Sequence, residues 1–288
     1  LIDTLPPHLR MCLFTLLTAD SSGIGRPDKA TLPQQTLLEI LVDNLEDKEK
    51  FFGPDGAYMD TRSWYGVVYN MKSEVSTIEW DANGGGYYDD EDFPDEMLKT
   101  GGSIDLHWLP ESVESFAITD MEFSGTVRTE ELPRNLRRLC IGGNSFLGSF
   151  DTKGLPRTLK DIYINCNGFS GSLLLTTLPA PLQIFTANTN KFGGSLDFSN
   201  LPEGLQTLYL CSNEFLGEID LSQIPNSIVS LKIEKNNFNL TSLRIRRGGV
   251  NELTLDQGKL RKGDIVDTDG VPLTFISWID AGVIRVTG

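Results

Sequence analysis

The chain has 288 residues, of which 39% are hydrophobic, so it can bury a substantial core in one large domain or two small ones. It carries 40 acidic and 25 basic side chains, and the resulting net charge of -15 excludes general binding to nucleic acid or to anionic membranes. No apolar run approaches the ~20 residues that a membrane-spanning helix needs, so insertion into a membrane is not expected either.

A helical N-terminal cap is expected over residues 1–74. The apolar stretch Met11–Ala19 is short and is interpreted as half of a packed helix rather than as the core of a signal peptide. A further helix is expected to begin near Pro33, with Thr31 as its N-cap, because proline is favoured in the first helical turn. Leucines at helical spacing then predict one apolar face, formed by Leu37, Leu38, Leu41 and Leu45.

The centre of the chain repeats with a period of 23 residues. Prolines that follow an apolar residue recur at this interval, at Pro110, Pro133, Pro156, Pro179, Pro202 and Pro225. Asparagines recur in the same register, at Asn144, Asn167, Asn190, Asn213 and Asn236, and a phenylalanine stands two positions after each. Three rows in one register indicate a solenoid whose repeats stack on their neighbours and whose two ends need caps.

One repeat, Leu201–Ile219, reads LPxxLxxLxLxxNxFxGxI and resembles the leucine-rich-repeat family, a resemblance that extends over roughly residues 75–258. The turn and the proline step look most like plant-type and protist repeats, which are typically a residue longer. The resemblance implies an α/β repeat fold: a leucine-rich-repeat solenoid with a parallel concave β-sheet, a helical N-cap and a β C-cap.

The segment Trp64–Val67, which follows the cap helix, resembles the N-terminal cap of plant-type repeat proteins. This resemblance implies that Trp64 packs in the core of the cap. The chain departs from the pattern at Val68 and Tyr69, where such a cap would have a cysteine.

Each part of the repeat has a physical role. The LxL strands place their leucines inward and stack in parallel at about 4.8 Å, so that about nine strands are expected on the concave face. The asparagine amide can satisfy backbone groups where the strand turns away, and the phenylalanine fills the convex side of the core. Glycine permits the tight turn that follows.

An insertion interrupts the first repeats. Asn83 lies 38 residues before Met121, which is one period plus 15, so residues 84–100 are interpreted as an acidic insertion. Its segment Asp89–Glu96 could bind a divalent cation, but it lacks the spacing of an EF-hand loop and is interpreted as a solvated acidic loop.

The spacing contracts at the C-terminal end of the array. The segments Leu240–Ile245 and Val250–Leu255 are interpreted as two further strands of the concave face, joined by turns too short for a convex segment. Alternating apolar residues after them predict a β cap over residues 259–288.

The cysteines favour a reducing, intracellular location. Secreted repeat proteins of this type usually cap their ends with paired cysteines, and no such cluster is present. The four cysteines are Cys12, Cys140, Cys166 and Cys211. The last three fall in different repeats and different columns, so buried or half-buried free thiols are expected there rather than a metal site. Asn239–Thr241 is an N-glycosylation sequon, but Leu240 between them is expected in the core, which favours a chance match.

The sequence contains no residue pattern typical of an enzyme active site. His8 and His107 are the two histidines, and neither has the neighbours of a catalytic triad or a metal site. Phosphate-binding and hydrolase motifs are also absent from the sequence. We therefore predict no catalytic activity, no cofactor and no metal.

Partner binding is expected on the concave face, because side chains that alternate with the inward leucines point outward. These outward positions change from acidic at the N-terminal end, through neutral and polar, to basic at the C-terminal end. An acidic segment of a partner could be steered to that basic end. The predicted partner-binding residues are Tyr163, Asn165, Asn188, Tyr209, Lys232, Lys235, Arg244, Arg246 and Arg247.

Three classes of function are compatible with this pattern. The first is a non-catalytic protein–protein interaction module, either a scaffold or one subunit of a larger assembly. The alternative is an extracellular or cell-surface recognition protein that binds a peptide or a glycan, which the missing cap cysteines count against. The third is a targeting domain for an enzyme on another chain.

Overall fold

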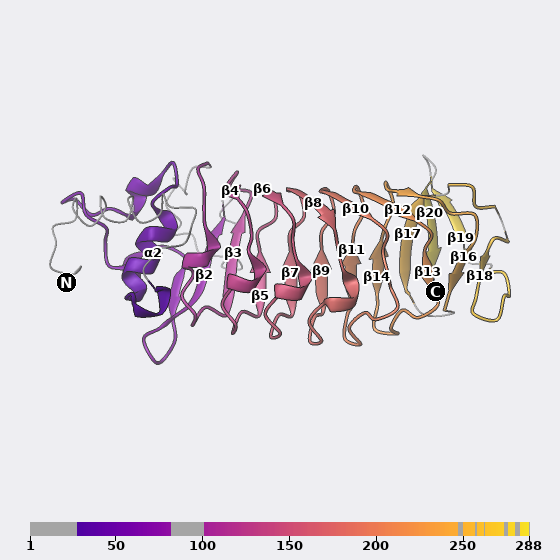
Figure 1. The fold of residues 1–288 in the computed structure, drawn as a ribbon, viewed down its shortest axis with the longest axis horizontal. Coiled ribbons are helices and arrows are strands. Elements are labelled where there is room, and N and C mark those ends of the chain that lie inside the picture. Colours follow the sequence, from indigo (N-terminus) through magenta and orange to yellow (C-terminus); the bar gives the residue numbers. More distant parts are fainter. Residues whose placement is uncertain are drawn as a thin grey trace.

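The structure is a computed structural model that describes residues 28–81, 101–246, 250–256, 258–261, 263–273, 276–279 and 283–287. Within these residues the chain coils into a solenoid whose strands lie side by side along its long axis, with the helix α2 at one end and the C-terminal strands at the other (Figure 1). The predicted helix at Met11–Ala19, the acidic insertion at residues 84–100 and Arg247 lie outside the described residues.

The N-terminal cap contains the predicted helix and its apolar face. The helix α2 spans Gln34–Val42, and Leu37, Leu38, Leu41 and Val42 on it are buried. Thr31 does not cap this helix, because it belongs to the preceding 3₁₀ helix η2 (Lys29–Thr31), which Asp28 caps instead. Trp64 is buried as predicted and packs 4.4 Å from Phe51, measured between ring centroids.

One long sheet runs the length of the solenoid and confirms the parallel repeat fold. In the described residues it has eight parallel strands. In spatial order they are β2 (Val75–Asp81), β3 (Ser115–Thr119), β5 (Arg138–Cys140), β7 (Asp161–Tyr163), β9 (Ile184–Thr186), β11 (Thr207–Tyr209), β14 (Ser230–Lys232) and β17 (Glu252–Asp256). All pairings between residues 113 and 235 in this sheet are parallel.

Antiparallel strands close the long sheet at both ends. β1 (Val67–Tyr69) pairs with β2, and β20 (Val283–Thr287) pairs with β17 and with β19 (Ile276–Ile279). The short strand β18 (Ile265–Val266) lies in another sheet. The C-terminal cap is therefore built from strands, as the alternating pattern predicts.

A second sheet forms on another side of the coil, immediately after each asparagine turn. Its strands are β4 (Ser124–Gly125), β6 (Ser145–Gly148), β8 (Gly168–Ser172), β10 (Lys191–Gly194), β12 (Glu214–Gly217) and β15 (Asn237–Phe238). The phenylalanines of this sheet point inward and stack between repeats at centroid distances of 6.1 to 6.5 Å. They form the predicted spine of the core, and Phe146, Phe169, Phe192 and Phe215 on it are 0% exposed.

Short 3₁₀ helices complete the turns of the early repeats. They are η5 (Leu106–Trp108), η6 (Thr129–Glu131), η7 (Thr152–Gly154) and η8 (Leu175–Thr177). Two further 3₁₀ helices, η3 (Lys48–Phe51) and η4 (Thr61–Ser63), belong to the N-terminal cap.

The asparagine row forms a ladder between repeats. The side-chain amide of Asn190 donates to the carbonyl of Ile164 in the preceding repeat at 2.9 Å and to Ala187 in its own at 3.2 Å. Its Oδ1 accepts from the backbone N–H of Phe169 at 3.0 Å. The same pattern recurs at Asn144, Asn167, Asn213 and Asn236.

The end of the repeat array differs from the prediction. Leu243–Ile245 forms strand β16, which pairs with β13 (Asp220–Leu221) and β18 in a separate three-stranded sheet. The next strand of the long sheet is β17, whose Leu253 pairs with Leu231. These two leucines are 22 residues apart, so the last repeat has nearly the ordinary length and β16 is its convex segment. The predicted contraction into two short concave repeats is wrong.

Candidate binding site on the long sheet

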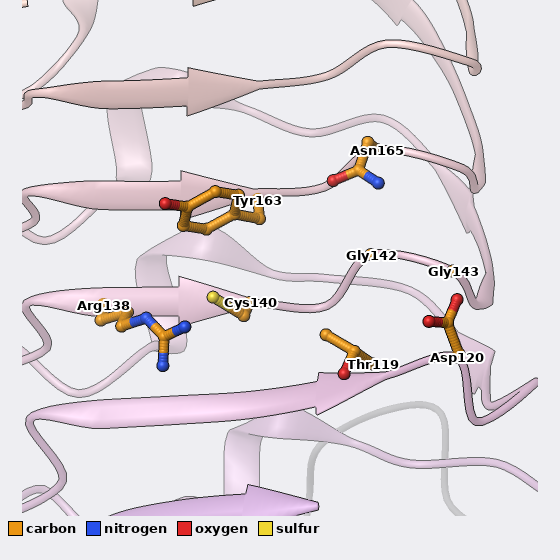
Figure 2. Close-up of a pocket in the computed structure, with 8 residues that line it drawn as sticks. All are labelled: Thr119, Asp120, Arg138, Cys140, Gly142, Gly143, Tyr163 and Asn165. Carbon is orange, nitrogen blue, oxygen red and sulfur yellow. The ribbon is translucent and has the colours of Figure 1, made fainter. Parts of the chain in front are cut away.

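A hollow of about 190 Å³ opens on the outward face of the long sheet. It lies where β3, β5 and β7 end and the chain turns toward the second sheet (Figure 2). Figure 2 shows Arg138 and Asp120 at opposite ends of the hollow, with Cys140 and Thr119 between them. Its lining residues are Thr119, Asp120, Arg138, Cys140, Gly142, Gly143, Tyr163 and Asn165.

The hollow forms because one repeat has small residues at two outward positions. Cys140 stands in register with Tyr163, and the following repeats carry Thr186 and Tyr209 at the same position. Two residues further along each strand, Gly142 takes the place that Asn165 occupies in the next repeat. The Asn165 side chain packs directly against Gly142, where a Cβ would come within 2.9 Å of the Asn165 Oδ1 atom, so no larger residue fits at this position without moving Asn165.

A row of left-handed backbone conformations sets the edge of the hollow. Asp120 has a φ of 54° and Gly143, one repeat later, has a φ of 66°. Cys166, Thr189, Ser212 and Lys235 continue the row, so the residue before each ladder asparagine adopts this conformation. Non-glycine residues enter it only where the surrounding structure holds them, and here the ladder does so. The repeat pattern does not predict this row.

The two ends of the hollow differ in charge compensation. The Arg138 guanidinium lies 3.3 Å from the Glu79 carboxylate, which balances its charge. Burial raises the pKa of the neighbouring Asp161 carboxyl, and Arg138 opposes that shift. The Asp120 side chain is exposed, and no described lysine, arginine or histidine forms an ion pair with it. Within the part of the chain that the structure describes, the hollow therefore presents a carboxylate without a cationic partner at one end only.

The thiol on the floor of the hollow is buried. Burial raises the pKa of Cys140 to about 12, and burial together with the nearby Glu234 raises that of Cys211 to about 11. Cys166 is exposed, so the prediction of a buried or half-buried thiol is wrong at this position. Because the thiolate is the reactive form, we expect iodoacetamide near pH 8 to label Cys166 well before Cys211 and Cys140. Peptide mass mapping over time measures the order, and Cys140 reacting as fast as Cys166 would contradict the packing described.

Six of the predicted binding residues lie on this face or at its edge. Tyr163 and Asn165 line the hollow, and Asn188 and Tyr209 continue the same surface toward the C-terminal end, each half-buried. Lys232 also projects from this face, with its ammonium 4.5 Å from the centroid of the Tyr209 ring, a cation–π contact. Lys235 is exposed at the edge, in the left-handed row.

Of the predicted basic end, the described residues leave only Lys232 and Lys235 on this face. Arg244 belongs to β16 and therefore projects from the three-stranded sheet, where its neighbours Leu243 and Ile245 are buried. Arg246 follows it and donates to Asn226 Oδ1 at 3.1 Å. On the long-sheet face, the acidic Glu234 and Glu252 lie near Lys232 and Lys235, so this end is of mixed charge. The Glu234 carboxylate accepts a hydrogen bond from Thr254 Oγ1 at 2.6 Å. The charge gradient failed as a prediction because alternation alone does not say on which side of the coil a strand lies.

The described residues do not provide the elements of a metal site or of a membrane crossing. Among them, no three His, Cys, Asp or Glu side chains gather closely enough to hold a metal ion. None of the described helices is long and apolar enough to span a membrane.

The hollow is smaller than the roughly 300–1,000 Å³ of most small-molecule pockets, and its volume suits one side chain of a larger partner.

Comparison with known proteins identifies the fold. No protein-family model and no curated protein matches the chain in sequence. The structure of a pollen receptor kinase 3 matches with a TM-score of 0.50 at 20% identity, covering 73% of this chain and 95% of that one. The PEPR1-AtPEP1 structure matches with a TM-score of 0.49 at 16% identity, covering 81% and 34%. The BIR2 ectodomain from Arabidopsis thaliana matches with a TM-score of 0.44 at 18% identity, covering 61% and 91%.

The chain has the leucine-rich-repeat fold, a parallel solenoid like that of the pollen receptor kinase 3 structure. It spans nearly the whole of the pollen receptor structure but about a third of the PEPR1 chain. The intracellular location predicted from the cysteines is contradicted, because the structure that matches with a TM-score of 0.50 is that of a receptor kinase. The reasoning failed because apolar packing builds the N-terminal cap, with Trp64 and Phe51 at its centre, and no cysteine pair is needed there.

Proposed function

We propose that this protein is a non-catalytic recognition module, displayed outside the cell, that binds a peptide segment of a partner on the outward face of its long sheet. The observation that carries the proposal is the hollow between β3, β5 and β7, whose floor is formed by small residues. At one end it carries the Asp120 carboxylate, which has no cationic partner among the described residues. Anchor side chains that fill such hollows supply much of the affinity of protein interfaces. The fold shared with a receptor kinase favours this function over an intracellular scaffold.

The occupant that best complements the hollow is a lysine or arginine side chain. Its aliphatic stem would lie over Cys140 and Gly142, and its cation would reach the Asp120 carboxylate. Arg138 at the other end does not oppose this arrangement, because Glu79 balances its charge. The net charge of -15 would also steer a basic segment toward the protein. This replaces the acidic partner segment expected from the sequence.

Two substitutions test the hollow directly. Cys140→Tyr fills it with the residue that the long sheet already carries at the equivalent position of two later repeats, Tyr163 and Tyr209, so the fold should tolerate it. Asp120→Asn removes the carboxylate and keeps the shape. A charge-assisted hydrogen bond contributes about 1.5–3 kcal/mol, so we expect Asp120→Asn to weaken peptide binding about ten- to a hundredfold. Cys140→Tyr should weaken it at least as much, because the anchor is excluded.

The probe is a linear peptide selected from a random displayed library on the immobilised wild-type chain. We expect a lysine or arginine to recur in the selected peptides, and calorimetry with one synthetic peptide then gives the affinities. Glu214→Gln, an exposed acid on the second sheet, and Arg244→Glu, on the three-stranded sheet, are the matched controls and should bind as the wild type does. Selected peptides without a basic residue, or equal peptide affinity of Cys140→Tyr and the wild type, would show that the hollow is not the binding site.

A further inference from the structure

The sequon Asn239-Leu240-Thr241 is the one N-x-Ser/Thr motif in the 288 residues. A buried position within a sequon argues against its use when the asparagine or the threonine is the buried residue. Here the buried residue is Leu240, at 2% exposure, whereas Asn239 and Thr241 on either side of it are exposed. The middle position of a sequon accepts any residue except proline, so burial of Leu240 anchors the segment without hiding the acceptor.

The surroundings of Asn239 suit a bulky modification. It directly follows β15, which is the last strand of the second sheet and pairs with β12 alone among the described strands. The backbone N–H of Asn239 donates to the carbonyl of Gly217 at 2.9 Å, so the main chain is held while the side chain projects. The ladder asparagines, in contrast, commit their amides to backbone groups; Asn236 donates to Leu210, Ile233 and Glu234. Asn239 therefore offers an accessible amide on an ordered segment.

We propose that Asn239 is an N-glycosylation site that carries an N-linked oligosaccharide. The inference rests on the extracellular location in the proposed function, because the modification belongs to secreted proteins. In the transfer, the Asn239 amide nitrogen bonds to the anomeric carbon of an oligosaccharide donated by a lipid diphosphate. The lipid diphosphate departs as the leaving group and the amide loses one proton.

The place of the glycan relative to the hollow has a structural consequence. Asn239 follows the second sheet, whereas the hollow lies on the long sheet between β3, β5 and β7. An oligosaccharide there would lie at the end of β15, on the last described strand of the second sheet. It would leave the peptide-binding face uncovered.

Mass spectrometry of the full chain, isolated from the medium or surface of the cells that make it, tests the site. Peptide N-glycosidase in ¹⁸O water should convert Asn239 into ¹⁸O-labelled aspartate. Asn239→Gln and Thr241→Ala should both lose the glycan, and Thr241→Ser should keep it because serine also completes the sequon. Asn237→Gln, an exposed asparagine without a hydroxyl residue two positions later, is the control and should remain glycosylated.

The outcomes separate this proposal from the function it rests on. A secreted chain with unmodified Asn239 that still binds the selected peptide would overturn the glycan and leave the recognition function standing. A chain confined to the cytosol would overturn both. Support for both would be a glycan on Asn239 together with equal peptide affinity of the wild type and Asn239→Gln.

Discussion

Replacing Phe192 with alanine is expected to lower the free energy of unfolding by about 3–5 kcal/mol. Phe192 is 0% exposed and stacks between Phe169 and Phe215, at centroid distances of 6.1 and 6.3 Å. Its neighbours belong to two other repeats, and a solenoid is stabilised mainly by contacts between adjacent repeats. The cavity would therefore weaken two interfaces at once. Urea unfolding followed by circular dichroism measures the change.

The control for this substitution is Leu216→Ala. Leu216 lies in the same sheet but is 52% exposed, so its removal should change the stability by less than about 0.5 kcal/mol. Equal stability losses in the two variants would mean that the phenylalanine row does not form the core.

Replacing Asn190 with alanine is expected to lower the free energy of unfolding by about 1–3 kcal/mol, because the N–H of Phe169 would lose its side-chain acceptor. The carbonyls of Ile164 and Ala187 would each lose one of two asparagine donors. Asn188→Ala is a matched control two positions earlier on the same turn, since Asn188 projects from the long-sheet face rather than into the ladder. Thermal melting of both variants decides the point. A larger loss in Asn188→Ala would show that the register of the ladder is wrong.

The sequence predicted most of the fold because the repeat encodes it three times over. Inward leucines, ladder asparagines and spine phenylalanines each have the same period. A repeat boundary misassigned from one of these rows would disagree with the other two. At the C-terminal end of the array the asparagine and phenylalanine rows stop, so the repeat boundary there was predicted from apolar alternation alone. Leu243–Ile245 has the apolar alternation of a strand, and β16 is a strand, but only the spacing from Leu231 to Leu253 reveals which strand continues the long sheet.

The binding face was less predictable than the fold. Tyr163 and Asn165 could be placed there from alternation alone, and both line the hollow. The hollow itself depends on small side chains in the preceding repeat, where Cys140 and Gly142 take the places that larger residues occupy in the next one. A comparison of equivalent positions between repeats would have revealed it. The left-handed conformation that presents Asp120 depends on long-range ladder contacts and leaves no local signal.

The most direct test of the account is amide chemical-shift mapping of the wild-type chain with the selected basic peptide. We expect the shifts to gather where β3, β5 and β7 end, around Thr119, Gly142 and Asn165, and to disappear in Cys140→Tyr at the same peptide concentration. Shifts confined to the second sheet or to the C-terminal strands, and unchanged in Cys140→Tyr, would contradict recognition through the long-sheet face.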